Sequence, residues 1–90
     1  MAMRLFSVGA REYAALTVLG SEEFDAMEVV EMTGAGRGGL LLEFRMDEES
    51  ATLAHLGAEV GIPLLRASLE IFREDFLEPR RAAGLRLPPW

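Results

Sequence analysis

Cysteine, lysine, asparagine and glutamine are all absent from this 90-residue chain. Without cysteine the chain cannot form a disulfide framework, a thiol nucleophile or a thiolate metal site. No apolar run approaches the roughly 18 residues that a membrane-spanning helix requires. A secretory signal is not expected either, because the apolar start Met1–Phe6 is soon interrupted by Arg11 and Glu12. We therefore expect a cytoplasmic protein with no membrane association.

The missing residue types also bear on heat stability. Scarce asparagine, glutamine and cysteine are typical of thermostable proteins, whereas the lack of lysine and the presence of five methionines are not. GC-rich coding would also explain the preference for arginine. Thermostability and codon bias therefore stay open as two explanations of this composition.

Positive charge is scarce over most of the chain. Residues 1–78 carry six arginines against all fifteen carboxylates, a net charge of −9, whereas residues 79–90 carry three arginines and no acid. An acidic body is repelled by phosphate backbones, so we expect no nucleic-acid partner. The basic end of the chain would instead be attracted to an acidic protein surface.

The most informative segment is the run of residues 29–44. Two apolar runs rich in strand-forming residues meet at residues 34–39, four of which are glycine. This pattern predicts a central β-hairpin. Its strands are expected at residues 25–33, with a bulge where the alternation slips at Val29–Val30, and at residues 40–46.

The second strand of this hairpin alternates most regularly and should supply the core. Its apolar side chains would share one face; they are Leu40, Leu42, Phe44 and Met46. We expect them to be buried beneath two helices that carry Leu16 and Leu53.

Segments with a helical pattern flank the hairpin. The apolar residues of segment 10–19 can share one helix face; they are Tyr13, Ala15, Leu16 and Leu19. Asp47 is a favourable N-cap for a second helix, which Gly61 and Pro63 would end. A first strand is expected at Met3–Val8. Its apolar residues fall on both parities, which is typical of a central strand covered on both faces.

Residues 64–72 fit two structures. As a strand, they place alternate residues inward, namely Leu65, Ala67, Leu69 and Ile71. As a helix, the same region forms an apolar stripe of Leu65, Leu69, Phe72 and Phe76, with Pro63 at the favoured first position. We predict the strand, at the sheet edge and antiparallel to the first strand, because it completes a compact two-layer fold. The helix stays open as the alternative.

The predicted order of elements is βαββαβ. It resembles the ferredoxin-like α+β sandwich, in which two helices cover one face of a four-stranded antiparallel sheet, over about residues 3–72. ACT-type regulatory domains are similar in this order and in the glycine that follows the first strand, here Gly9. Many unrelated activities share this fold, so the resemblance says little about function. We expect one domain at residues 1–78 and a basic, apolar C-terminal arm at residues 79–90.

The predicted topology would gather glycines and one arginine at the same end of the sheet. Arg37, between Gly36 and Gly38, is the charged side chain of the hairpin tip, and free amides near Ser7 and Gly9 would start the first helix close by. Amides and a guanidinium together bind anions. We therefore predict a weak site for a small anionic ligand there. The alternative is a hairpin that simply uses the conformational freedom of glycine.

Apolar residues outside the predicted core suggest a partner. Leu87 and Trp90 lie in the C-terminal arm, and Leu41 points away from the predicted helices. A chain this short buries roughly 60–68% of its unfolded surface, so pairing would help to stabilise it. We expect these three residues to contribute to a homodimer interface, with a frayed C-terminus as the alternative.

No catalytic constellation is evident in the sequence. His55 has no second histidine or cysteine as a partner and is expected at the surface. Asp47, Glu48 and Glu49 are explained by a helix N-terminus better than by a metal ion. We therefore predict a non-catalytic homodimeric interaction or regulatory module without metal or cofactor. A sensor of an anionic metabolite and a small enzyme with a site shared between subunits are the alternatives.

Overall fold

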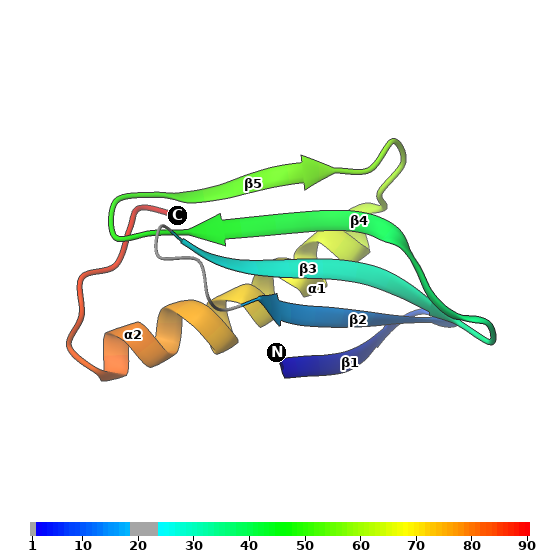
Figure 1. Ribbon diagram of the computed structural model, residues 1–90, viewed down its shortest axis with the longest axis horizontal. Coiled ribbons are helices and arrows are strands. Elements are labelled where there is room, and N and C mark those ends of the chain that lie inside the picture. Colours follow the sequence, from blue (N-terminus) through cyan, green and yellow to red (C-terminus); the bar gives the residue numbers. More distant parts are fainter. Residues whose placement is uncertain (1, 19–23) are drawn as a thin grey trace.

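The structure is a computed structural model that describes residues 2–18 and 24–90. Within these residues, five strands form one antiparallel sheet in which each strand pairs with its neighbours in the sequence (Figure 1). The strands are β1 (Ala2–Val8), β2 (Arg11–Val18), β3 (Asp25–Thr33), β4 (Gly36–Met46) and β5 (Ala51–Leu56). The sheet is therefore a meander built from sequence-adjacent pairings.

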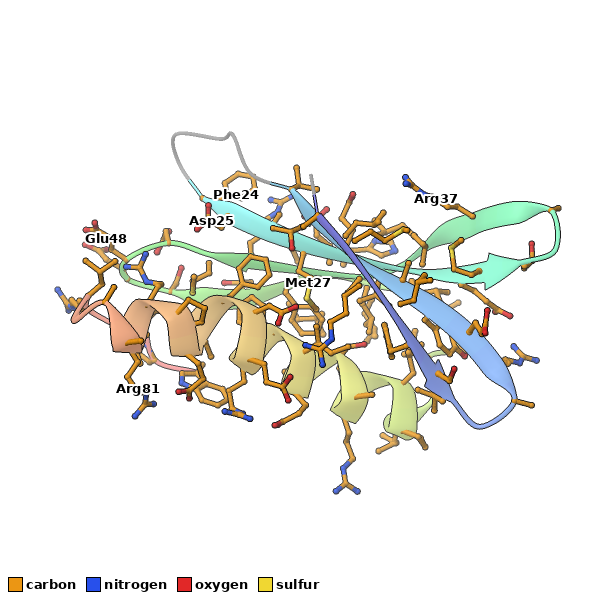
Figure 2. All side chains as sticks on the ribbon, turned by 90° about the horizontal axis from the view of Figure 1, so that it is seen from below. Phe24, Asp25, Met27, Arg37, Glu48 and Arg81 are labelled. Carbon is orange, nitrogen blue, oxygen red and sulfur yellow. The ribbon has the colours of Figure 1, made fainter. Side chains whose placement is uncertain are left out.

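The helical part of the chain follows the sheet and covers one face of it. It comprises α1 (Ile62–Phe72), a π-helical turn η1 (Arg73–Leu77) and α2 (Glu78–Ala82). Figure 2 shows this helical segment along one side of the sheet, with Met27 pointing toward it and Arg37 pointing away. We call the two sides the helix-side face and the outer face. No helix of the described residues lies on the outer face.

The predicted βαββαβ sandwich is wrong, and the first difference lies in β2. Residues 11–18 form a strand where we predicted a helix, and Leu19 lies outside the described residues. Residues 13–16 are all buried, alternately in the helix-side core and on the outer face. Four consecutive apolar residues fit a strand covered on both faces as well as a helix, so periodicity alone did not separate the two.

The second predicted helix is instead a turn followed by β5. The Asp47 carboxylate accepts hydrogen bonds from the backbone N–H groups of Glu49 (2.8 Å) and Ser50 (2.7 Å). The Asp47 N–H donates to the carbonyl of Ser50 (3.0 Å). Aspartate stabilises tight turns by the same side-chain acceptor that caps helices, so this residue did not distinguish between them.

Residues 64–72 belong to α1, so the predicted fourth strand is also wrong and the helical alternative is correct. Pro63 lies in the first turn, and the Gly61 carbonyl accepts from the N–H of Leu65 (3.1 Å). The buried stripe is offset from the predicted one and comprises Leu64, Ser68, Ile71 and Phe72. A five-stranded meander leaves its helix-side face open, and this stripe covers it.

β1 is an edge strand, not the central strand that we predicted, because it pairs with β2 alone among the described strands. The central hairpin of β3 and β4 is confirmed, and its pairing register shifts at Val29–Val30. Leu42, Phe44 and Met46 are buried on the helix-side face, as expected, but beneath the helical segment rather than beneath Leu16 and Leu53. Leu40 lies on the outer face, because the register shift changes the parity of β4.

Pro79 accounts for the π-helical turn in the middle of the helical segment. Proline has no N–H and its ring clashes with the carbonyl four residues earlier in a regular α-helix. The wider turn lets the N–H of Glu78 reach the carbonyl of Arg73 instead. It also brings two consecutive residues, Phe76 and Leu77, onto the buried side.

The helical segment ends in a Schellman motif and the tail returns to the sheet. Gly84 adopts a left-handed conformation (φ 72°), its N–H donates to Arg81, and the N–H of Leu85 donates to Arg80 (2.9 Å). The residues that follow run back toward the turn between β4 and β5 (Figure 1). Leu87 packs against the helix-side core on the way.

Candidate functional site

The outer face carries a row of apolar side chains, one from each of the strands β1 to β4. Leu5 pairs with Ala14, Ala14 with Val30, and Val30 with Leu40. We call these four residues the apolar belt. Because cross-strand partners project from the same face, the belt crosses most of the width of the sheet.

The belt is covered in the middle and open at the edge. Ala14 and Val30 are buried, and Leu16 and Met32 belong to the same cluster. On the edge strand β1, by contrast, Leu5 is 60% exposed and Met3, in the neighbouring row, is 51% exposed. Large apolar side chains that gather at an exposed sheet edge mark an interaction surface.

Charged residues border the belt on both sides. On one side, Met32 pairs with both Glu12 and Arg37, and the Arg37 side chain points away from the helical segment (Figure 2). On the other side, Glu28 pairs with Glu43, and Glu43 pairs with His55 on β5.

The pair of glutamates at the second border is electrostatically unfavourable within one chain. Carboxylates directly opposite each other on neighbouring strands repel. Arg45 forms an ion pair with Glu43 and also lies over the ring of Phe24, 4.9 Å from its centroid. Glu28 has no ion-pair partner among the described residues, and neither has Arg37. The outer face therefore presents Arg37 together with Glu12 at one border, and an excess of negative charge from Glu28 and Glu43 at the other.

The predicted anion-site residues lie in or beside two turns at one end of the sheet (Figure 1). Ser7 is near the end of β1 and Gly9, with φ 61°, is in the turn that follows. Gly36, Arg37 and Gly38 begin β4. The two turns are thus neighbours, but the helix N-terminus on which the prediction partly relied does not exist, because residues 11–18 are a strand.

The space between these two turns is lined by acidic side chains, Glu12 and Glu31. Arg11 also lines it and forms an ion pair with Glu31 (3.5 Å). Two carboxylates disfavour an anion in this space. The role of Arg37 in an anion site stays a prediction.

The three residues predicted for an interface lie in different surroundings. Leu41 and Leu87 are half-buried and pack against the helix-side core. Trp90 is 61% exposed and lies beside a cavity next to β5. Whether any of them contacts a partner stays a prediction. The outer-face residue Leu5 was missed because β1 was predicted to be a central strand covered on both faces, and Ala14 was missed because β2 was predicted to be a helix.

The groups with shifted pKa values serve the fold rather than a reactive centre. Backbone hydrogen bonds lower the pKa of Asp47 in its turn. The hydrogen bond from Arg73 lowers the pKa of Glu70, and the hydrogen bond to Glu74 raises the pKa of Arg4. Within residues 2–18 and 24–90, no cluster of three or more acidic or histidine side chains could hold a metal ion.

Comparison with known proteins found no matching family model, no similar curated protein and no similar solved structure. Across the described residues, no helix has the length and apolar character needed to cross a membrane.

Proposed function

We propose that this chain is a small interaction module, without catalysis of its own, that forms a homodimer through the outer face of its sheet. The observation that carries the proposal is the apolar belt, whose open end at Leu5 and Met3 exposes large apolar side chains next to an edge strand. Burying these side chains would remove from water the most exposed large apolar side chains of the outer face.

The charged borders of the belt on one copy are complementary to those on a second copy. Consider two sheets packed through their outer faces, with a twofold axis that lies between them and runs along the belt. This axis brings each belt onto the other and places Leu5 opposite Leu5 of the second copy. It also places the row of Arg37 opposite the row of Glu28 and Glu43. The outer face therefore matches a second copy of itself both in the position of its apolar belt and in its charges.

Substitution of Leu5 tests the apolar part of this interface. Burying a leucine side chain stabilises the dimer by about 1.5–3 kcal/mol, and the twofold symmetry buries one Leu5 from each copy. Leu5→Glu should therefore raise the dimer dissociation constant by at least about 100-fold. Leu85→Glu is the matched control, because Leu85 is 54% exposed and lies beyond the helical segment. Sedimentation at a series of concentrations gives the mass, and circular dichroism checks that each variant is folded.

A charge exchange tests the orientation of the two copies. Arg37→Glu and Glu28→Arg should each weaken the dimer, and the double variant should recover most of the loss. Exposed ion pairs contribute about 0.2–1 kcal/mol each, so the effects should shrink at high salt. A wild-type chain that stays monomeric at high micromolar concentration would refute the proposal of a homodimeric module. A dimer insensitive to Leu5→Glu would refute the outer face as its interface.

A further inference from the structure

A cavity of about 250 Å³ lies on the helix-side face, between β5, α1 and the tail. Its floor is formed by Phe44 and Phe72, whose rings stack with centroids 5.3 Å apart. Both rings are almost fully buried, so the floor is held in place by the core. Leu53 and Leu69 form walls from the strand and the helix, and Trp90 closes one side.

The lining determines which ligands the cavity can accept. None of its eight described lining residues has a charged side chain, although the chain carries fifteen acidic residues, and Thr52 is the one polar residue among them. A charged ligand placed there would lose its hydration without gaining an ion pair. An apolar ligand would instead cover Leu53, Leu69 and Trp90, which are each 40% or more exposed.

The volume sets the size of the ligand. An apolar cavity of about 150 Å³ holds one benzene ring, so this larger cavity has room for two fused rings. A helix of another protein, about 10–12 Å across with its side chains, is too wide to enter it. Aromatic walls and a stacked floor favour a flat molecule, because aromatic rings interact best in offset or edge-to-face arrangements.

We propose that this cavity is a binding site for an uncharged, flat ligand of about two fused rings, with Trp90 as one of its walls. This site is distinct from the proposed dimer interface, because the cavity lies on the helix-side face and the belt on the outer face. The two proposals can therefore fail independently.

The chain carries its own reporter for this site, since Trp90 is its single tryptophan. Indane, an uncharged hydrocarbon of two fused rings, is the probe, and indane-2-carboxylate is its charged counterpart. Titration with indane should shift the Trp90 emission to shorter wavelength in a saturable way. The carboxylate should bind at least about tenfold more weakly. Equal binding of the two probes, or no saturable shift with indane, would overturn the proposal.

Ala51 lies in the cavity lining and allows a substitution that fills the site without removing a core group. Ala51→Leu should weaken indane binding by about tenfold or more. Ala54→Leu, on the same strand but outside this lining, is the matched control and should bind as the wild type does. Leu5→Glu should also bind indane normally, because Leu5 is on the other face.

A second variant keeps the test decisive if Ala51→Leu does not fold. Leu69→Gln replaces a wall residue that is already 41% exposed, so folding should be unaffected and indane binding should fall. Unchanged indane affinity in a folded wall variant would place the ligand elsewhere and overturn the proposal.

Discussion

Arg4 on the edge strand β1 donates a hydrogen bond to Asp75 on the π-helical turn, at 2.9 Å between Nη1 and Oδ1. The Arg4 guanidinium also pairs with Glu74 at 3.0 Å. These ion pairs join the first strand of the meander to the helical segment 71 residues later.

The exposure of this ion pair sets the size of its effect. The side chains of Arg4 and Asp75 are 43% and 36% exposed, so solvent screens their attraction. Arg4→Ala should therefore lower the free energy of unfolding by only about 0.2–1 kcal/mol, and less in high salt. Urea melts at low and high salt would show this. A larger loss that salt does not reduce would indicate a packing role for the Arg4 stem.

Phe44 is a large aromatic residue of the helix-side core. Its ring is 3% exposed and stacks on Phe72. Phe44→Ala should cost about 3–5 kcal/mol, which is a large part of the total stability of a small domain. Phe24→Ala is a control, because Phe24 is only half-buried and lies over Arg45 on the outer face. Similar melting temperatures for the two variants would contradict this assignment of the core.

Gly36 is required by the conformation of the central hairpin. Its φ of +113° lies in a region that residues with a Cβ rarely adopt, whereas Gly34 has open space around it and no such φ. Gly36→Ala should destabilise by about 1–3 kcal/mol, and Gly34→Ala should change stability far less. Thermal melting of the two variants distinguishes them, and equal effects would mean that the hairpin adopts another turn.

Ser68 carries a buried hydroxyl that has no hydrogen-bond partner among the described residues. An unsatisfied buried polar group costs about 1–3 kcal/mol, and alanine is the better helix former. Ser68→Ala should therefore stabilise the fold by about 1 kcal/mol. Ser7→Ala, at an exposed strand position, should be nearly neutral. Chemical denaturation gives both values, and a destabilised Ser68→Ala would show that the hydroxyl is bonded after all.

Asp47 makes the turn before β5 sensitive to acid. Hydrogen bonds from the backbone of Glu49 and Ser50 lower the pKa of Asp47 in the folded state. The carboxylate therefore stabilises the fold above its unfolded pKa of about 3.9, and this contribution is lost as the pH falls through the lower folded pKa.

A comparison of the wild type with Asp47→Ala across pH tests the role of Asp47 in this turn. Their melting temperatures should differ most at neutral pH, and the difference should shrink as the pH falls below the unfolded pKa of about 3.9. A difference that is constant down to strong acid would exclude the charge of Asp47 as its cause.

The features that depend on local geometry could be predicted from the amino-acid sequence. Strong β propensity on both sides of a glycine turn predicts a hairpin wherever it occurs, and β3 has the predicted bounds Asp25–Thr33. Leu42 and Phe44 were expected in the core from the alternation of one strand alone, and they are buried. The slip at Val29–Val30 was likewise visible as two consecutive apolar residues.

Only the tertiary structure decided the remaining elements, because their local signals fit two structures equally well. Four apolar residues at 13–16 suit a helix face or a strand buried on both sides, and the choice depends on whether another strand lies next to them. Asp47 caps a helix or a turn with the same oxygen. Residues 64–76 carry an apolar stripe that fits a helix. The helix is favoured over a strand only because an open face of the sheet is available for this stripe to cover.

The candidate sites follow the same division. Residue types in the sequence indicated that apolar side chains exceed what a thin core needs, and that charge is uneven along the chain. Which of these side chains share a face depends on strand pairing: the belt exists because Leu5, Ala14, Val30 and Leu40 come from four strands in register. The cavity beside Trp90 likewise requires the tail to return to β5 and α1 after the helical segment. Local propensity is a property of the chain alone, whereas a surface or a cavity is a property of how its segments pack.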